Sequence, residues 1–163
     1  MYYTPLINNA LKLSFSLHRN QSDKSGVPYV YHPYAVAEIA CRSIFPDAEG
    51  KISEPDEYVI CAALLHDSIE DCGVDEGFLI EYGIPAPVAD AVRALTHPEG
   101  VEYLDYVRKI KDNPIAAKVK YADLTHNSDL SRIDLSDDEA RKKAEKRIEK
   151  YRKALKILSG EEI

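Results

Sequence analysis

Apolar residues recur at intervals of three and four positions along most of the chain, which is the spacing of an amphipathic helix. The first such segment follows Thr4 and Pro5, a pair that is typical of a helix start, and runs to about His18. No set of alternating apolar and polar positions predicts strands. We therefore expect an all-α protein whose residues 1–163 form one domain, a single compact bundle of about eight helices. The other expected helices start near His32 and cover residues 54–71, 74–82, 85–95, 101–111, 113–130 and 136–159.

The expected helix over residues 54–71 changes from apolar to polar near its end. Residues 59–65 are apolar, and a dense group of polar side chains follows directly: His66, Asp67, Glu70 and Asp71. At about 100° per residue, these side chains would face roughly one side of a continuous helix. Since a buried carboxylate needs an ion pair, hydrogen bonds or a metal, the group indicates a binding or catalytic site. The alternative is a solvated helix end with an adventitious histidine–aspartate pair.

Two other segments carry side chains of the same kinds. His32 stands at the start of a helix, and Asp123 and Asn127 lie four residues apart on one face of another helix. Taken singly, each has an ordinary structural interpretation, as a capping histidine or an internal hydrogen-bonded pair. Together with His66 and Asp67, they supply two imidazoles and two carboxylates, which suit Mn²⁺, Fe²⁺ or Zn²⁺. The absence of a thiolate favours manganese or iron over a structural zinc site.

The composition argues against several classes of protein. A formal net charge of −7 is unfavourable for broad nucleic-acid binding, because phosphate contacts need a basic surface. No apolar run approaches the roughly 18 residues that span a bilayer, and the first residues lack a secretory signal pattern. We therefore expect a cytoplasmic protein without a membrane partner. The three cysteines form neither an even set nor a CxxC pair and are expected to be reduced, and the oligomeric state is left open.

Three segments hold most of the chemically active side chains: SGVPYVYHP at 25–33, ALLHDSIED at 63–71 and VKYADLTHN at 119–127. In this order they resemble the HD-domain superfamily, and more narrowly the hydrolase domain of the Rel/SpoT alarmone enzymes and the stand-alone small alarmone hydrolases. A histidine–aspartate dipeptide alone would be weak evidence, whereas the ordered set is specific for this branch. The resemblance implies an all-α fold with one divalent metal, usually manganese. It also implies a small nucleotide substrate, (p)ppGpp, from which the 3′-pyrophosphate is removed.

The resemblance implies a role for each matching residue. The metal ligands would be His32, His66, Asp67 and Asp123. The acidic pair that activates and positions the attacking water would be Glu70 and Asp71. The substrate-binding residues would be Asn127, near the nucleotide, and Lys24 and Ser25, in the loop beside the base and phosphates. Lys118 or Lys120 could offset the charge of the substrate phosphates if either faced the cleft.

Some positions depart from the pattern of these relatives. Asp23 stands in the loop where family members usually have arginine, and His97 where they commonly have lysine. The stretch between His32 and His66 is longer than usual, and no synthetase domain follows, so we expect a hydrolase alone. The departures leave two alternatives open: a phosphohydrolase that acts on another nucleotide or phosphoester, and a catalytically silent nucleotide-sensing module. His97 and His126 are optional ligands for a second metal.

Overall fold

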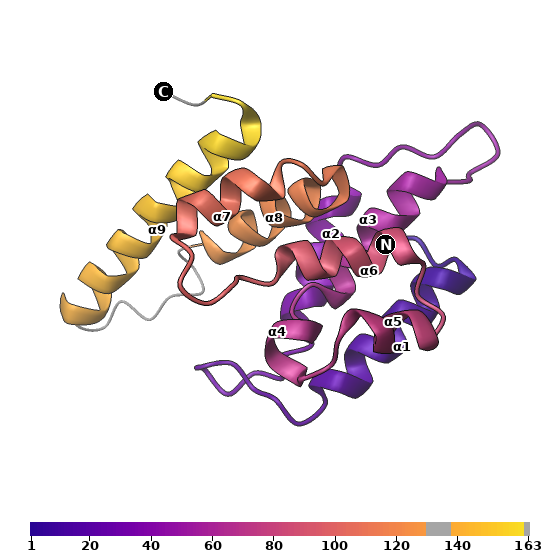
Figure 1. Ribbon diagram of the computed structural model, residues 1–163, viewed down its shortest axis with the longest axis horizontal. Helices are drawn as coiled ribbons and strands as arrows, with labels where there is room; N and C mark the ends of the chain where they lie inside the picture. The colour runs from indigo at the N-terminus through magenta and orange to yellow at the C-terminus, as the bar shows by residue number, and fades with distance from the viewer. Residues whose placement is uncertain (130–137, 162–163) are drawn as a thin grey trace.

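The computed structural model describes residues 1–129 and 138–161, and within these ranges the chain forms α-helices and no strand. This confirms the expected all-α fold, although the described ranges contain nine helices where about eight were expected. The N-cap expected at Ser136 lies outside the described residues. The helices (Figure 1) are α1 (Pro5–His18), α2 (Tyr31–Cys41), α3 (Glu54–Leu65), α4 (Ser68–Cys72), α5 (Glu76–Glu81), α6 (Ala86–Leu95), α7 (Tyr103–Ile110), α8 (Pro114–Asn127) and α9 (Asp138–Ser159).

The hydrophobic core surrounds α3. Every residue from Val59 to Leu65 is buried, because this part of the helix is apolar on all sides and can be stable only when covered on all sides. Helices α1, α2, α6 and α8 pack around it. The turn that follows Leu65 therefore begins from a firmly held helix end.

Replacing Leu64 with alanine is expected to lower the free energy of unfolding by about 3 kcal/mol, because this side chain of α3 is fully buried and its loss leaves a cavity. Urea denaturation followed by circular dichroism measures the change. Ile80→Ala on α5 is the control: Ile80 is 45% exposed, so its loss should cost about 1 kcal/mol or less. Equal losses in the two variants would contradict the central position of α3.

The expectation of one helix over residues 54–71 is wrong, because the chain forms two helices there, and this accounts for the additional helix. Asp67 lies between them with φ −95° and ψ −1°, at the edge of the helical region. The Ser68 hydroxyl donates to the Leu65 carbonyl at 2.6 Å, which satisfies an acceptor at the end of α3. Aspartate and serine both favour helix starts, so this dipeptide was a signal for the break. The turn replaces the single helical face expected for the polar side chains.

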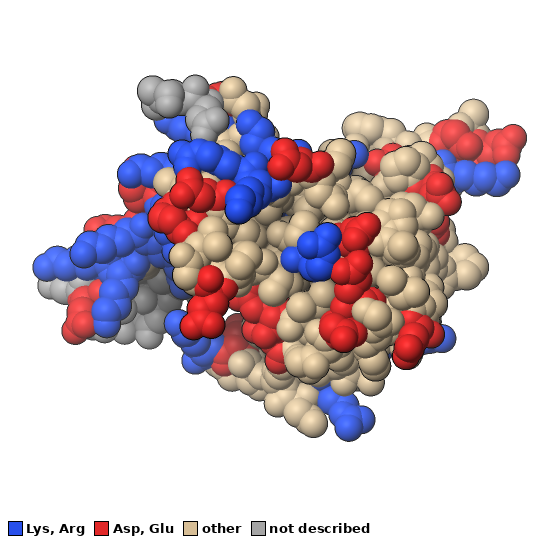
Figure 2. Space-filling view, in the orientation of Figure 1, with Lys and Arg blue, Asp and Glu red and all other residues tan. Residues whose placement is uncertain are grey.

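Helix α9, whose Ala154 and Ile157 side chains are buried in the core, lies against α7 and α8 at one side of the molecule (Figure 1). Lys and Arg side chains gather along it (Figure 2), as the charged pattern of its sequence indicates. The segment between α2 and α3 projects from the opposite side. In the part of the chain that the structure describes, no helix is both long and apolar enough to cross a membrane.

Candidate metal centre and adjoining cleft

Four side chains converge where α2, α3, α4 and α8 meet. His32 lies in the first turn of α2, Asp123 lies on the buried side of α8, and His66 and Asp67 occupy the turn between α3 and α4. His66 and Asp123 are 3% and 4% exposed, respectively. The structure thus brings together all four residues that the sequence assigned to a metal.

The imidazole nitrogens of this group lie within a few ångströms of the carboxylate oxygens. Nε2 of His66 is 3.1 Å from Oδ2 of Asp67 and 3.9 Å from Oδ1 of Asp123. Nε2 of His32 is 3.5 Å and 3.4 Å from the same two oxygens. Neighbouring donors around one cation with ligand bonds of about 2.1 Å are separated by about 3 to 3.5 Å. The distances are close to this spacing: His32, His66 and Asp123 form a group that could hold one metal ion, and Asp67 lies beside both imidazoles.

His66 has the protonation pattern of a metal ligand. Its Nδ1 lies 2.9 Å from the carbonyl oxygen of Ala63, and since a carbonyl only accepts, Nδ1 carries the proton and donates. Its Nε2 is buried, makes no hydrogen bond within the part of the chain that the structure describes, and is directed at the two carboxylates. A buried nitrogen lone pair facing carboxylates, with the other ring nitrogen held by a backbone carbonyl, suits a divalent cation.

Further hydrogen bonds orient the two carboxylates. The Tyr29 hydroxyl donates to Oδ2 of Asp67 at 2.7 Å. Asp123 accepts from the Asn127 amide at Oδ1, at 2.6 Å, and pairs with the Lys120 ammonium at Oδ2, at 2.9 Å. Such partners fix the direction in which a ligand oxygen points. Asn127, which the resemblance placed near the nucleotide, lies at the cleft and also holds a carboxylate of the candidate metal centre.

The charges of the centre shift the pKa values of its members. Burial raises the pKa of Asp67, but the adjacent His66 outweighs it and holds this pKa at about 2. Burial alone would lower the pKa of His66, but the negative charge of Asp67 has the larger, opposite effect, and the pKa rises to about 9. Burial alone would raise the pKa of Asp123, but Lys120 and the two imidazoles lower it far below the ordinary value. Without a cation, a proton on His66 offsets part of the negative charge of the carboxylates.

The metal-free protein is expected to lose stability as the pH rises from about 6.5 to 9. The pKa of His66 is about 9 in the folded chain and about 6.5 in the unfolded chain, so its contribution is complete below the lower value and disappears through the higher one. The contribution of His66 to the free energy of unfolding is about 3 kcal/mol. Urea denaturation in EDTA at several pH values measures it, with His66→Gln as the control that should show no such decline. An unchanged wild-type stability across this window would contradict the assigned charge.

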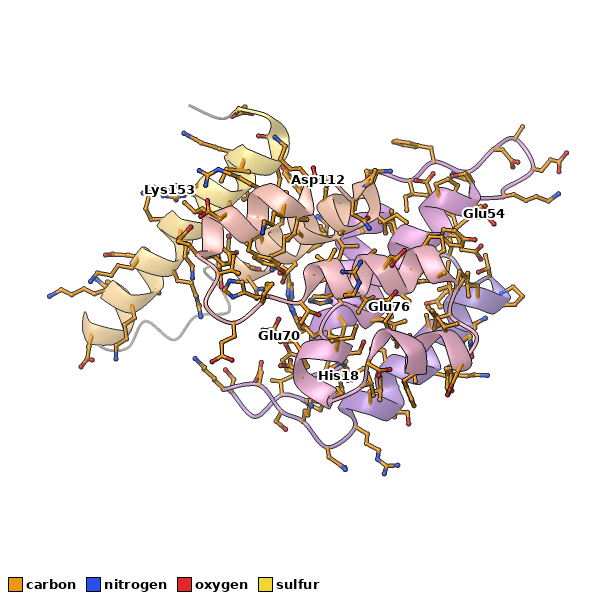
Figure 3. The ribbon with its side chains drawn as sticks, in the orientation of Figure 1. His18, Glu54, Glu70, Glu76, Asp112 and Lys153 are labelled. Carbon is orange, nitrogen blue, oxygen red and sulfur yellow. The ribbon has the colours of Figure 1, made fainter. Side chains whose placement is uncertain are left out.

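A cavity of about 440 Å³ opens beside the four side chains. Glu70 lines it, and Oε2 of Glu70 accepts the backbone N–H of His97 at 3.2 Å; Figure 3 shows Glu70 on α4. Asp71 is the next residue but is not among the described residues that line this cavity. Burial raises the pKa of Asp71, and the negative charge of Asp67 adds to the effect. The structure thus separates the acidic pair into one residue at the cavity and one beside it.

Helices α7, α8 and α9 give the cavity a basic and aromatic part. The Lys150 ammonium lies 4.3 Å from the centre of the Tyr103 ring, and that of Lys120 lies 5.6 Å from the centre of the Tyr106 ring. Tyr151 completes this part of the lining. Sequence reasoning anticipated a role for Lys120 but missed Lys150 and the tyrosines, because the pattern of α9 is equally typical of a solvated charged face.

The loop between α1 and α2 brings Asp23 to the cavity. Its Oδ1 accepts the backbone N–H groups of Ser25, at 2.8 Å, and Val27, at 3.0 Å, so the carboxylate stabilises the loop. Lys24 and Ser25, which the resemblance assigned to the substrate, are exposed and do not line the cavity. The acidic residue of this loop, and not the adjacent lysine, therefore faces the space beside the metal centre.

Comparison with known proteins connects this geometry to a family. A family model described as HD domain matches residues 10–159. A guanosine-3′,5′-bis(diphosphate) 3′-pyrophosphohydrolase MESH1 from Danio rerio is 33% identical over 138 residues, which cover 79% of this chain and 71% of that protein. A probable GTP pyrophosphokinase from Mycobacterium leprae is 28% identical over 86% of this chain, which spans only 18% of that relative. The solved structure of a metazoan SpoT ortholog that hydrolyzes ppGpp has a TM-score of 0.63 and 24% identity, covering 98% of this chain and 95% of that one.

The chain therefore belongs to the HD-domain family. The similarity to MESH1 and to Rel/SpoT homologues confirms the narrower resemblance that the three sequence segments indicated. The solved structure shares the all-α fold along almost the whole chain. Family membership and the grouped histidine and aspartate side chains both point to a divalent metal.

Proposed function

We propose that this protein is a metal-dependent hydrolase that removes the 3′-pyrophosphate of (p)ppGpp or a closely related alarmone, and that residues 1–163 act as one domain. The observation that carries the proposal is the convergence of two imidazoles and two carboxylates at a cavity that two further carboxylates and two lysines line. The MESH1 relative, which bears the name of this activity, matches most of the chain. The ligands would be His32, His66, Asp67 and Asp123.

The proposed metal is Mn²⁺, as the resemblance to the alarmone hydrolases implies, with Fe²⁺ and Zn²⁺ as alternatives. The four proposed ligands supply nitrogen and oxygen donors and no thiolate. Such a set is typical of a site for these cations and less typical of a structural zinc site. A bound divalent cation lowers the pKa of water and polarises a phosphoryl oxygen. The hydrogen bonds from Tyr29, Lys120 and Asn127 keep the two carboxylates in position for it.

Glu70 is the proposed general base. It lines the cavity next to Asp67, and the backbone N–H of His97 holds one of its oxygens. A carboxylate held in this position can accept the proton of the water that attacks the phosphorus. Asp71, beside Tyr29 and Asp67, would orient Glu70 and the water from the next position along α4.

The lysines and polar residues around the cavity would bind the nucleotide. Lys120 and Lys150 offer positive charge to phosphate groups, and the tyrosine rings beside them offer flat surfaces for a base or sugar. Asn127 stays a proposed substrate residue through its place at the cavity. Lys24 and Ser25, exposed in the neighbouring loop, would contribute by closing over a bound nucleotide.

Incubation of the purified protein with ppGpp and Mn²⁺ tests the proposal. Pyrophosphate should be released and GDP should accumulate, both measured by ion-exchange chromatography, and EDTA should stop the reaction. Failure with Mn²⁺, Fe²⁺ and Zn²⁺ in turn, together with turnover of a different nucleotide, would reject the alarmone as substrate.

A second candidate, hydrolysis of another nucleotide, is favoured by Asp23. This carboxylate faces the cavity at a position where arginine is usual in the family that the chain resembles, so it repels substrate phosphates. Asp23→Asn keeps an oxygen that can accept from the Ser25 and Val27 N–H groups but removes the charge. If the alarmone is the substrate, this variant should lower KM for ppGpp a few-fold at low salt. A rise in KM for another nucleotide in the same variant would favour the second candidate.

A further inference from the structure

His126 contacts a proposed metal ligand from the side that faces away from the donor group. Its Nδ1 lies 2.8 Å from Nδ1 of His32. The two imidazole rings are stacked, with centroids 5.0 Å apart and an angle of 26° between their planes. Tyr29 and His66 place their rings edge-on to the same His32 ring, at 5.6 Å and 5.1 Å. The His32 ring is therefore held by three other rings.

The short contact between the two Nδ1 atoms requires one proton between them, because one nitrogen must donate and the other must accept. Nε2 of His32 faces Oδ2 of Asp67 and Oδ1 of Asp123, where a metal ligand needs its lone pair. A neutral His32 that ligates through Nε2 carries its proton on Nδ1. His126 must then accept a hydrogen bond from this N–H at its own Nδ1, as the Ala63 carbonyl does for His66.

The position of His126 on α8 ties this contact to the other side of the centre. Asp123 and His126 are three residues apart, so one helical face presents both a proposed ligand and the support of a second ligand. Any shift of α8 would move both together. This explains a histidine that the sequence left as an optional ligand for a second metal.

We propose that His126 is a positioning residue that fixes the tautomer and ring orientation of His32 for metal binding. The inference rests on the proposed metal centre, and it adds a residue that touches neither the metal nor the substrate. His126 acts through its Nδ1 lone pair, so a side chain that keeps an acceptor near this point should preserve the function. A side chain of similar volume that lacks an acceptor should not preserve the function.

Three variants of the full chain test the role, with Mn²⁺ affinity measured by isothermal titration calorimetry. His126→Leu removes the acceptor and should weaken Mn²⁺ binding about 10- to 100-fold. His126→Asn places its amide oxygen near the original Nδ1 and should remain within a few-fold of the wild type. Thr125→Ala is the control. This residue is the exposed neighbour on α8, and within the described residues its hydroxyl bonds to the helix carbonyl of Tyr121, so the Mn²⁺ affinity of the variant should equal that of the wild type.

Wild-type affinity in His126→Leu would overturn the inference while leaving the proposed function intact. Equal losses in the leucine and asparagine variants would also overturn it, because they would indicate loss of packing alone. If the wild type bound no divalent cation, the metal centre and this inference would fall together. Nitrogen-15 NMR of the wild-type chain loaded with Zn²⁺ adds a test without substitution: His32 should carry its proton on Nδ1 and His126 on Nε2, and the opposite tautomers would contradict the proposal.

Discussion

His66→Ala is expected to abolish divalent metal binding and to lower kcat/KM for ppGpp by more than about 1,000-fold. The imidazole supplies a buried Nε2 that makes no hydrogen bond within the described residues and lies 3.1 Å and 3.9 Å from carboxylate oxygens of Asp67 and Asp123. Its loss leaves Asp67 and Asp123 with one imidazole fewer to offset their charges. Calorimetric titration with Mn²⁺ and pyrophosphate release measure the two effects independently.

Asp67→Asn provides a matched test with almost no change in shape. The amide can still accept from the Tyr29 hydroxyl but has lost the charge that a cation needs, so activity should fall by a similar factor. Thermal unfolding of the metal-free variants checks that both remain folded. Full activity in either one, with one equivalent of Mn²⁺ still bound, would show that the metal lies elsewhere.

The helices were largely predictable because local chemistry sets their starts. Thr4 and Asn113, each followed by proline, cap α1 and α8 with their side chains as the sequence indicated. The break between α3 and α4 was missed because the apolar run before it continues smoothly into polar residues at helical spacing. The signal was the Asp67–Ser68 pair, two residue types common at helix starts; Ser68 bonds to the Leu65 carbonyl at the break, while the Asp67 side chain makes no capping hydrogen bond.

The proposed metal ligands of the site could be predicted from the sequence, whereas several residues that line the adjoining cavity could not. The proposed ligands His32, His66, Asp67 and Asp123 were recognisable because they stand in three ordered segments that resemble the HD-domain pattern. Lys150 and Tyr103 could not be assigned from sequence, because they reach the cavity only through the packing of α9 on α7. Contacts between segments far apart in the chain, such as that of His126 with His32, leave no local pattern.

Glu70→Gln is expected to lower kcat by about 100- to 10,000-fold while Mn²⁺ affinity stays within a few-fold of the wild type. Glutamine keeps the length of the side chain and an oxygen that can accept the His97 N–H, so the geometry of the cavity persists. What disappears is the group that takes the proton of the attacking water. Single-turnover kinetics at saturating Mn²⁺ and ppGpp measures the effect on chemistry apart from binding.

Asp71→Asn and Glu81→Gln make the comparison decisive. Asp71 is not among the described residues that line the cavity, and burial together with Asp67 raises its pKa, so its loss should reduce kcat less than that of Glu70 does. Glu81 is exposed on α5, away from the centre, and its variant should match the wild type. A larger loss in Asp71→Asn would reverse the two roles, and a KM effect without a kcat effect in Glu70→Gln would make Glu70 a binding residue. The position of Glu70 at the cavity, with a backbone N–H holding one oxygen, favours the base.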